Sequence, residues 1–127
     1  MIDKWFALQV SHAKPAQAAE ITELLTRHVD FDWKNPNRFR SVMGALAGNA
    51  AGFHHNSGAA YALLADWLIK LDPLNPQTAA RMSGVFETWR RYDADRQAQM
   101  RAALTRIQST KNLSRDTSEM VTRILGD

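Results

Sequence analysis

Apolar residues recur every three or four positions along almost the whole chain, which is the spacing that places them on one face of an α-helix. No segment shows a convincing alternation of apolar and polar residues, the pattern of a half-buried β-strand. The pattern predicts about seven helices, near residues 2–9, 15–28, 36–47, 58–71, 76–92, 94–107 and 115–125. Short connections between helices of this length favour antiparallel neighbours. We therefore expect an all-α fold, a superhelical stack of antiparallel helices of the HEAT or armadillo kind.

Polar residues at the expected helix starts agree with these boundaries. Asn35-Pro36 and Asn75-Pro76 each combine a strong N-cap with a residue that fits the first helical position. Asp93 and Ser114 are the expected caps of the last two helices. The two Asn-Pro starts lie about 40 residues apart, which indicates a repeat of stacked helix pairs.

The middle of the chain contains a loop and an unusually apolar helix. Residues 50–57 are expected to form the loop, with Asn56 or Ser57 capping the next helix. The helix 58–71 is apolar nearly all round, so we expect it to be covered on several sides.

Large side chains are assigned to the core by their spacing. Trp5, Trp67 and Trp89 are expected in the core, and Leu24 shares the apolar face of its helix. Trp33 lies in an expected turn. We favour a role in filling the gap between helix pairs, because a large aromatic ring contributes most when it is desolvated. The alternative is that Trp33 lines a surface groove.

Composition narrows the class of protein. A chain of 127 residues is long enough for one domain with an ordinary core, and we expect a single helical domain over 1–127. It has no cysteine, which excludes disulfides, thiolate nucleophiles and zinc sites built on cysteine. No stretch approaches the roughly 18 apolar residues of a membrane span, and the N-terminus lacks the regions of a signal peptide. We expect a cytoplasmic protein with no membrane partner.

The charge pattern indicates a mixed surface. The formal net charge is +3, and arginines outnumber lysines eleven to five. Basic residues are interleaved with acids, as in residues 90–96, which is typical of a solvated helix face. A nucleic-acid-binding protein more often gathers its basic residues on one face. We therefore expect no nucleic-acid partner.

No motif in the sequence carries catalytic chemistry. The chain contains neither the His-Glu-x-x-His pair of a zinc site nor the Gly-x-Ser-x-Gly turn of a serine nucleophile. His54-His55 is interpreted as part of a polar loop rather than as a pair of metal ligands. The acidic pairs Asp30/Asp32 and Asp93/Asp95 are expected to lie in turns and helix starts, where carboxylates favour the helix dipole.

The two Asn-Pro helix starts form a candidate anion site. Arg38 and Arg40 follow the first start, and Arg81 follows the second within two turns. A helix N-terminus close to a guanidinium suits a carboxylate or a phosphate. The alternative is that these arginines pair with acids on neighbouring helices.

Several motifs, taken in order over the whole chain, resemble a known family. They are Asp3-Lys4-Trp5-Phe6, Leu8-Gln9, residues 34–41 (KNPNRFRS), Phe53-His54, Asn75-Pro76-Gln77, residues 91–94 (RYDA), Arg96-Gln97 and Asn112-Leu113-Ser114. The chain resembles the C-terminal domain of bacterial aminopeptidase N, the alanyl aminopeptidase of the zinc gluzincin family. The resemblance implies an excised C-terminal part of a larger multi-domain enzyme, a zinc metallopeptidase that releases N-terminal amino acids from peptides. The zinc would belong to that enzyme's catalytic domain, so this chain would hold no catalytic residue, no metal and no cofactor.

The resemblance also implies a role for particular residues. In the family, this domain closes over the catalytic domain and limits access to the active-site cavity. By their positions in the motifs, Arg40, Gln77 and Arg81 correspond to residues that contact the downstream part of the peptide substrate. The implied partners are the catalytic domain of the same enzyme and its peptide substrates.

The sequence also allows a function other than that of an aminopeptidase domain. The chain could be a free-standing helical-repeat module that binds proteins and needs no catalytic partner. The coding region upstream of Met1 would discriminate between the two, because only the first interpretation places the catalytic motifs there.

Overall fold

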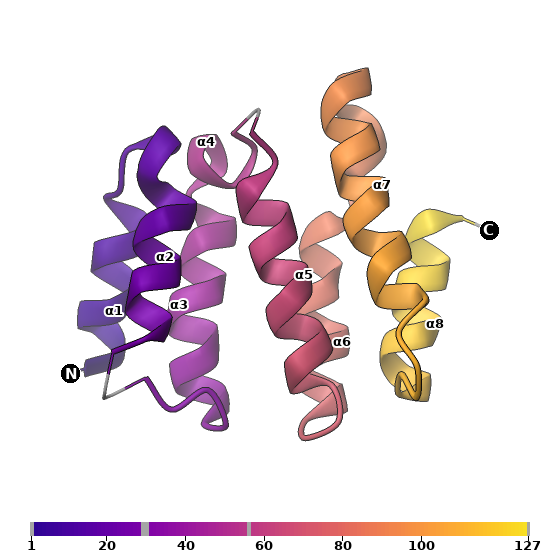
Figure 1. Ribbon diagram of the computed structural model, residues 1–127, viewed down its shortest axis with the longest axis horizontal. Coiled ribbons are helices and arrows are strands. Elements are labelled where there is room, and N and C mark those ends of the chain that lie inside the picture. The colour runs from indigo at the N-terminus through magenta and orange to yellow at the C-terminus, as the bar shows by residue number, and fades with distance from the viewer. Residues whose placement is uncertain (1, 29–30, 56, 127) are drawn as a thin grey trace. The chain divides into compact units, whose positions relative to one another are not determined.

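The computed structural model describes residues 2–28, 31–55 and 57–126. In this part of the chain the structure is all-α, with eight α-helices, three short 3₁₀ helices and no strand (Figure 1). The α-helices are α1 (Ile2–Ser11), α2 (Ala18–Thr26), α3 (Pro36–Gly48), α4 (Ala50–Phe53), α5 (Ala59–Leu71), α6 (Pro76–Ser83), α7 (Ala94–Gln108) and α8 (Arg115–Leu125). The 3₁₀ helices are η1 (Pro15–Gln17), η2 (Gly84–Phe86) and η3 (Trp89–Arg91). The expected all-α class is confirmed.

The chain divides into two compact units, residues 1–63 and 64–127, and α5 crosses the boundary between them. Within the described residues, none of the helices combines the length and the apolar character needed to span a bilayer.

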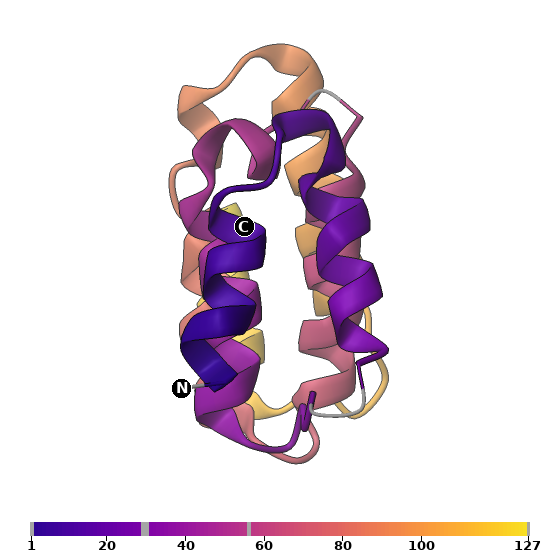
Figure 2. The ribbon, with the colours of Figure 1, turned by 90° about the vertical axis from the view of Figure 1, so that its left-hand side faces the viewer.

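The first unit is built on α1, α2 and α3, which pack against one another. α1 and α3 run in the same direction and α2 runs opposite to both (Figure 1), and Figure 2 shows α2 as a second layer facing the other two. The buried side chains that these helices share are Phe6, Val10, Ala18, Leu25, Phe39, Val42, Met43 and Leu46. They recur at helical spacing in the sequence, so the pattern places this part of the core correctly.

Asn49 connects the junction of α3 and α4 to the end of α1. Its side-chain Nδ2 donates to the carbonyl oxygens of Val10 and Ala13, each at 3.0 Å. Its Oδ1 accepts the backbone N–H of Gly52 at 3.2 Å and so caps α4. The prediction of a loop over 50–57 is therefore wrong for residues 50–53, because this cap starts one more turn of helix.

The second unit contains α6, α7 and α8. α6 and α8 pack along each other in the same direction, and α7 packs on α8 in the opposite direction (Figure 1). The indole N–H of Trp89 in η3 donates to the carbonyl oxygen of Ile124 at 2.9 Å, near the end of α8. The buried side chains of this unit include Leu64, Leu68, Ala79, Phe86, Met100, Leu104, Ile107 and Val121.

A buried carboxylate joins the turn after α5 to the start of α8. Asp72 is only 2% exposed. Its Oδ2 accepts the backbone N–H of Ser114 at 2.7 Å, and its Oδ1 accepts the Ser114 hydroxyl at 2.6 Å. The Ser114 hydroxyl oxygen in turn accepts the backbone N–H of Thr117 at 3.2 Å. Both carboxylate oxygens are thus hydrogen-bonded, as burial of this group requires.

The predicted N-caps are confirmed. Asn35, Asn75 and Asp93 each accept a backbone N–H from the first turn of the following helix, and Ser114 does the same for α8. Three of these helix starts, at residues 35, 75 and 114, lie about 40 residues apart. The repeat seen in the two Asn-Pro starts therefore has a third member, in which serine replaces asparagine.

The prediction of one helix over 76–92 is wrong. α6 ends at Ser83, and η2 and η3 follow it. The Ser83 hydroxyl donates to the carbonyl oxygen of Ala79 at 2.8 Å, a bond that weakens or bends a helix. The next residue, Gly84, has a low helix propensity. Together they account for the change from α to 3₁₀ geometry.

Some side chains lie elsewhere than their spacing predicts. Trp5 is 42% exposed and Leu24 is 57% exposed, so the prediction that both belong to the core is wrong. Trp89 is buried as expected, and Trp67 is half-buried. Trp33 is also half-buried, with the Lys34 ammonium 6.0 Å from the centre of its ring. Its role in filling a gap between helix pairs stays a prediction.

The expectation that α5 is covered on several sides is only partly met. α5 exposes a stripe formed by Ala62, Asp66 and Lys70, each one turn from the next. Of its two predicted caps, Ser57 accepts a backbone N–H of the first turn at 3.3 Å, whereas Asn56 lies outside the described residues.

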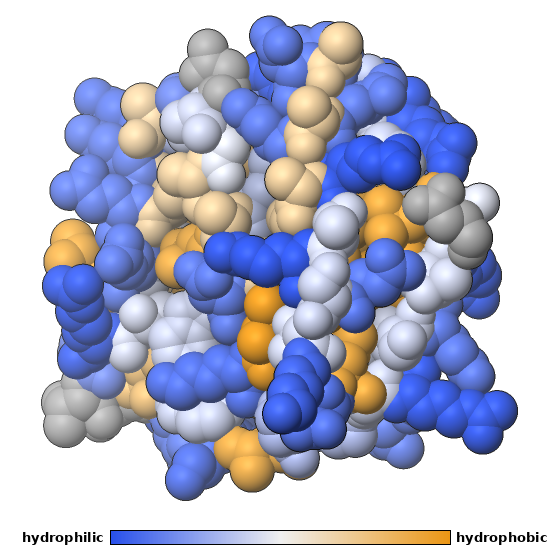
Figure 3. Space-filling model, turned by 45° about the vertical axis from the view of Figure 1, so that its right-hand side comes forward, coloured by the Kyte–Doolittle hydropathy of each residue, from blue (hydrophilic) through white to orange (hydrophobic). Residues whose placement is uncertain are grey.

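Charged side chains of both signs are spread over the surface. Figure 3 shows a face on which hydrophilic side chains, in blue, surround smaller hydrophobic areas. Several ion pairs form within one helix or its cap, as between Glu23 and Arg27 at 3.1 Å and between Asp93 and Arg96 at 2.8 Å. This arrangement agrees with the interleaved charges of the sequence.

Candidate functional site

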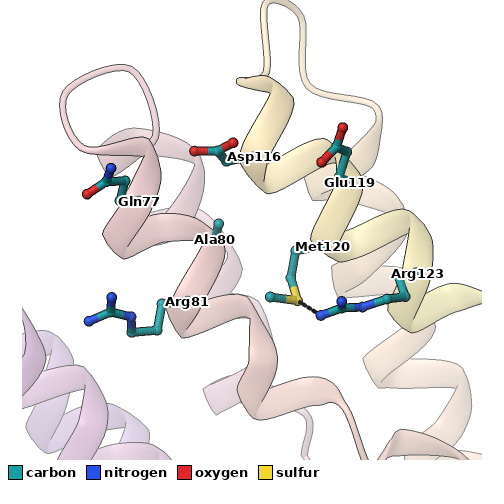
Figure 4. Close-up of a pocket in the computed structure, with 7 residues that line it drawn as sticks. All are labelled: Gln77, Ala80, Arg81, Asp116, Glu119, Met120 and Arg123. Atoms are coloured by element: carbon teal, nitrogen blue, oxygen red, sulfur yellow. Dashed lines mark hydrogen bonds between the residues drawn. The ribbon is translucent and has the colours of Figure 1, made fainter.

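An open cleft of about 680 Å³ lies between α6 and α8 in the second unit. α6 lines it with Gln77, Ala80 and Arg81, and α8 lines it with Asp116, Glu119, Met120 and Arg123 (Figure 4). The lining thus combines two guanidinium groups, two carboxylates and one amide with two small or flexible apolar side chains. Such a cleft suits a polar ligand that carries both hydrogen-bonding groups and charge.

Gln77 and Arg81 form the α6 side of the cleft. They are four residues apart, so they lie one turn apart on the same side of the helix (Figure 4). The cap of α6 fixes this geometry, because the Asn75 side chain accepts the backbone N–H of Thr78 at 3.1 Å. Both side chains belong to exposed residues, and neither makes a hydrogen bond or ion pair with any residue that the structure describes. Their donors are available to a ligand.

The position of Arg81 within its helix differs from the prediction. The sequence placed Arg81 near the start of a long helix, but α6 is only eight residues long and Arg81 lies in its last turn. The helix dipole is negative there and favours the cation. The guanidinium is therefore stabilised in place, while the helix N-terminus does not add to its positive potential.

The α8 side of the cleft carries the acidic residues. Asp116 lies in the first turn, where the helix dipole favours a carboxylate. Glu119 accepts a hydrogen bond from Arg115 at 2.9 Å. This hydrogen bond and the charge of Glu119 raise the pKa of the Arg115 guanidinium, which stays cationic in any case. Farther along, Nη2 of Arg123 lies 3.1 Å from the Met120 sulfur (Figure 4).

Arg40 belongs to the first unit, whereas Gln77 and Arg81 belong to the second. Arg40 is half-buried, and its Nη2 donates to the side-chain oxygen of Asn37 at 2.8 Å. The partner is an amide rather than an acid, so this bond leaves the charge of Arg40 unneutralised. A shared anion site formed by Arg40 and Arg81 stays a prediction.

The first Asn-Pro helix start offers fewer amides than the sequence implies. The Asn35 side chain accepts the backbone N–H groups of Asn37 and Arg38 at 3.0 and 3.3 Å, so the cap already occupies them. The Arg38 guanidinium lies 6.0 Å from the centre of the Phe6 ring. The guanidinium groups, rather than the helix amides, are therefore the stronger candidates for binding an anion.

The two adjacent histidines have different surroundings. Nδ1 of His54 lies 2.6 Å from the hydroxyl of the buried Tyr61, and Nδ1 of His55 lies 3.0 Å from the Ser57 hydroxyl. Over the described ranges, no three His, Asp or Glu residues are grouped so that they could hold a metal ion. The predicted acidic cap Asp93 is confirmed, whereas Asp30 lies outside the described residues.

Sequence reasoning missed the α8 side of the cleft. Asp116 and Glu119 were not among the candidate residues that the sequence indicated. The repeat of helix starts contained the missing signal: Gln77 comes two residues after the cap Asn75, and Asp116 comes two residues after the cap Ser114. Equivalent positions on parallel, neighbouring helices lie side by side, which brings these two side chains to one cleft.

Comparison with known protein families shows the class of domain to which the chain belongs. A family described as "Domain of unknown function (DUF3458_C) ARM repeats" matches residues 1–126. The chain belongs to this family of armadillo-repeat domains, in agreement with its all-α structure and its recurring helix starts.

The individual proteins to which the chain is similar are aminopeptidases. Aminopeptidase N of Caulobacter vibrioides is 44% identical over 127 residues, and aminopeptidase N of Haemophilus influenzae is 42% identical over 126 residues. These matches cover 99% and 98% of this chain but only 15% and 14% of the relatives. A crystal structure of Legionella pneumophila aminopeptidase A in complex with aspartic acid matches with a TM-score of 0.91 and 36% identity, over 98% of this chain and 14% of that one. The resemblance to the C-terminal domain of aminopeptidase N is confirmed.

Proposed function

We propose that this chain acts as the non-catalytic C-terminal domain of an aminopeptidase N, which closes over the catalytic domain and limits access to the active-site cavity. One observation carries the proposal: the chain is 42–44% identical over nearly its whole length to aminopeptidases N, of which it spans about 15%. In such an enzyme the partners are the catalytic domain and the peptide substrate. The absence of cysteine favours a cytoplasmic location.

Within this proposal, Gln77 and Arg81 contact the downstream part of the substrate. A guanidinium can donate two parallel hydrogen bonds to a carboxylate, and a side-chain amide can both donate to and accept from a peptide group. Both side chains have these groups unused within the described part of the chain. Arg40 is the third proposed contact, since its bond to Asn37 uses one of several guanidinium donors.

The zinc ion of such an enzyme would be held outside this chain. Zinc requires three or four His, Cys, Asp or Glu ligands. The residues described here offer no such group, and the chain has no cysteine. The contribution of this chain would be to bind and orient the peptide and to exclude bulky substrates.

The test is the substitution Arg81→Ala in the complete enzyme that contains this chain. A substrate's C-terminal carboxylate would lose a charge-assisted hydrogen bond, so we expect kcat/KM for a tripeptide to fall about tenfold. A single-residue amide substrate does not reach beyond the cleavage point, so its kcat/KM should change less than about twofold. Steady-state kinetics on both substrates measure the difference.

A matched control separates this effect from a general loss of positive charge. Arg106 is an exposed arginine of α7 that pairs with Asp66 at 2.9 Å and does not line the cleft. We expect Arg106→Ala to leave both substrates unchanged. If Arg81→Ala weakens turnover of the tripeptide and the amide equally, contact with the downstream residue is refuted.

A further inference from the structure

The cleft between α6 and α8 contains opposite charges that do not neutralise each other. Arg81 and Asp116 line the same cleft from different helices. Within the described residues, neither side chain forms an ion pair, with the other or with any third residue. Glu119, the second acid of the lining, is already paired with Arg115.

The Arg81 side chain extends from α6 away from α8, so Arg81 and Asp116 stay apart (Figure 4). Figure 4 shows Arg81 on the side of α6 that carries Gln77, and Asp116 on α8 near the start of that helix. Ala80 and Met120 also line this cleft. One is small and the other is flexible, so the cleft can admit an aliphatic chain alongside them.

A cleft with a separated cation and anion fits a ligand with the complementary pair. A peptide that ends in lysine or arginine has one, because its terminal α-carboxylate and its side-chain cation are joined by a flexible aliphatic stem. The carboxylate can accept paired hydrogen bonds from a guanidinium, and the cation can approach a carboxylate.

We propose that Asp116 is a specificity-determining residue, which makes the cleft prefer peptides with a basic C-terminal residue. The terminal carboxylate of the peptide binds Arg81, and its basic side chain lies beside Asp116. The positive Arg123 on the same lining works against this preference, and so does Arg115, which interacts electrostatically with Asp116 and is paired with Glu119. The inference rests on the proposed function, because it places a peptide end in this cleft.

The experiment compares alanyl-alanyl-lysine, alanyl-alanyl-alanine and alanyl-alanyl-glutamate as substrates of the complete enzyme, before and after Asp116→Asn. We expect the wild type to have a higher kcat/KM for the peptide ending in lysine than for the peptide ending in alanine. Asp116→Asn should reduce the ratio of these two values about three- to fivefold, because an exposed charge pair contributes little. Asp116→Lys should reverse the order and favour glutamate. Raising the salt concentration should reduce the wild-type preference, because exposed charges are screened.

Asp95→Asn is the matched control. Asp95 occupies the same position in the first turn of α7 as Asp116 does in α8, two residues after the cap, but it does not line the cleft. Both substitutions remove a favourable interaction with the helix dipole. They should therefore differ only in their effect on the preference for a lysine-ending substrate over an alanine-ending one. We expect Asp95→Asn to leave the ratio unchanged.

The outcomes separate the two proposals. If Asp116→Asn leaves the lysine-to-alanine ratio unchanged, or if Asp95→Asn changes it as much, the role of Asp116 is refuted. If Arg81→Ala still lowers kcat/KM for the tripeptide more than for the amide, the proposed function stands even though the role of Asp116 is refuted. If Arg81→Ala affects both substrates equally, the proposed contact of Arg81 with the downstream residue fails, and the role of Asp116 fails with it.

Discussion

Asp72 shows how one residue can depend on a partner far away in the sequence. Its carboxylate is buried, and a buried charge is tolerated only when it is hydrogen-bonded. Both bonds come from Ser114, which lies 42 residues later in the chain. Ser114 is also the cap of α8, so the carboxylate helps to fix the helix that forms one side of the cleft.

We predict that Asp72→Ala lowers the free energy of unfolding by about 2–4 kcal/mol, because it removes two charge-assisted hydrogen bonds and leaves the amide of Ser114 without its acceptor. Urea denaturation at neutral pH measures the change. The control is Asp66→Ala, which breaks the exposed ion pair with Arg106 and should cost at most about 1 kcal/mol. Equal losses in the two variants would contradict the structural role of Asp72.

Single residues also show where sequence spacing misleads. Trp5 and Leu24 have the spacing of core residues, yet Trp5 is 42% exposed and Leu24 is 57% exposed. Helical spacing indicates which residues share a face of the helix. It does not indicate how much of a wide apolar face the neighbouring helices cover. Arg81 is exposed and makes no hydrogen bond or ion pair within the described residues, and its role as a binding residue stays a prediction.

At the scale of elements, the N-terminal starts of helices were predicted better than the lengths of the helices. Four N-caps lie where Asn, Asp and Ser indicated, because a cap is a local interaction within one turn. The break after α6 and the extra turn of α4 were missed. Both depend on side-chain hydrogen bonds. The Ser83 hydroxyl bonds to a carbonyl oxygen of α6 and weakens that helix, whereas the Asn49 side chain caps the added turn of α4.

Two glycines provide a prediction at this scale. Gly84 has helical dihedral angles (φ −61°, ψ −17°), and a Cβ added there would meet nothing within 4 Å. We expect Gly84→Ala to raise the free energy of unfolding by about 0.4–1 kcal/mol, because alanine restricts the unfolded chain.

Gly52 in α4 is the contrasting position. It is buried, and an added Cβ would lie 2.5 Å from the Cβ of Ala18. We expect Gly52→Ala to lower the free energy of unfolding by about 1–3 kcal/mol through overpacking. Thermal or urea denaturation of both variants tests the pair, and a shift in the same direction would show that the local geometry is not responsible.

At the scale of the whole molecule, the proposal is that this chain completes a larger enzyme. We predict that mixing the 127-residue chain with the separately produced remainder of such an aminopeptidase restores peptide turnover, because the two parts re-form the enclosed cavity. Assays with short and long peptides measure both rate and size preference. If the remainder alone has full activity and the same preference for short peptides, the gating role is wrong.

The alternative of a free-standing protein-binding module is also decided at this scale. An armadillo-repeat domain can serve either purpose, since fold alone does not define function. The coding region upstream of Met1 discriminates, because only the first interpretation places a catalytic domain with its zinc motif there.

The sequence by itself determined the helical class, four N-caps and the candidates Arg40 and Arg81, and its resemblance to a known family added Gln77. These follow from spacing, from caps and from motifs, which are local properties that a chain carries in any arrangement. Only the tertiary structure decided that Asp116 shares a cleft with Arg81 and that Asp72 is bonded to Ser114. Those contacts join residues about 35 to 42 positions apart, and they exist only because the packing of α6 against α8 brings distant turns together.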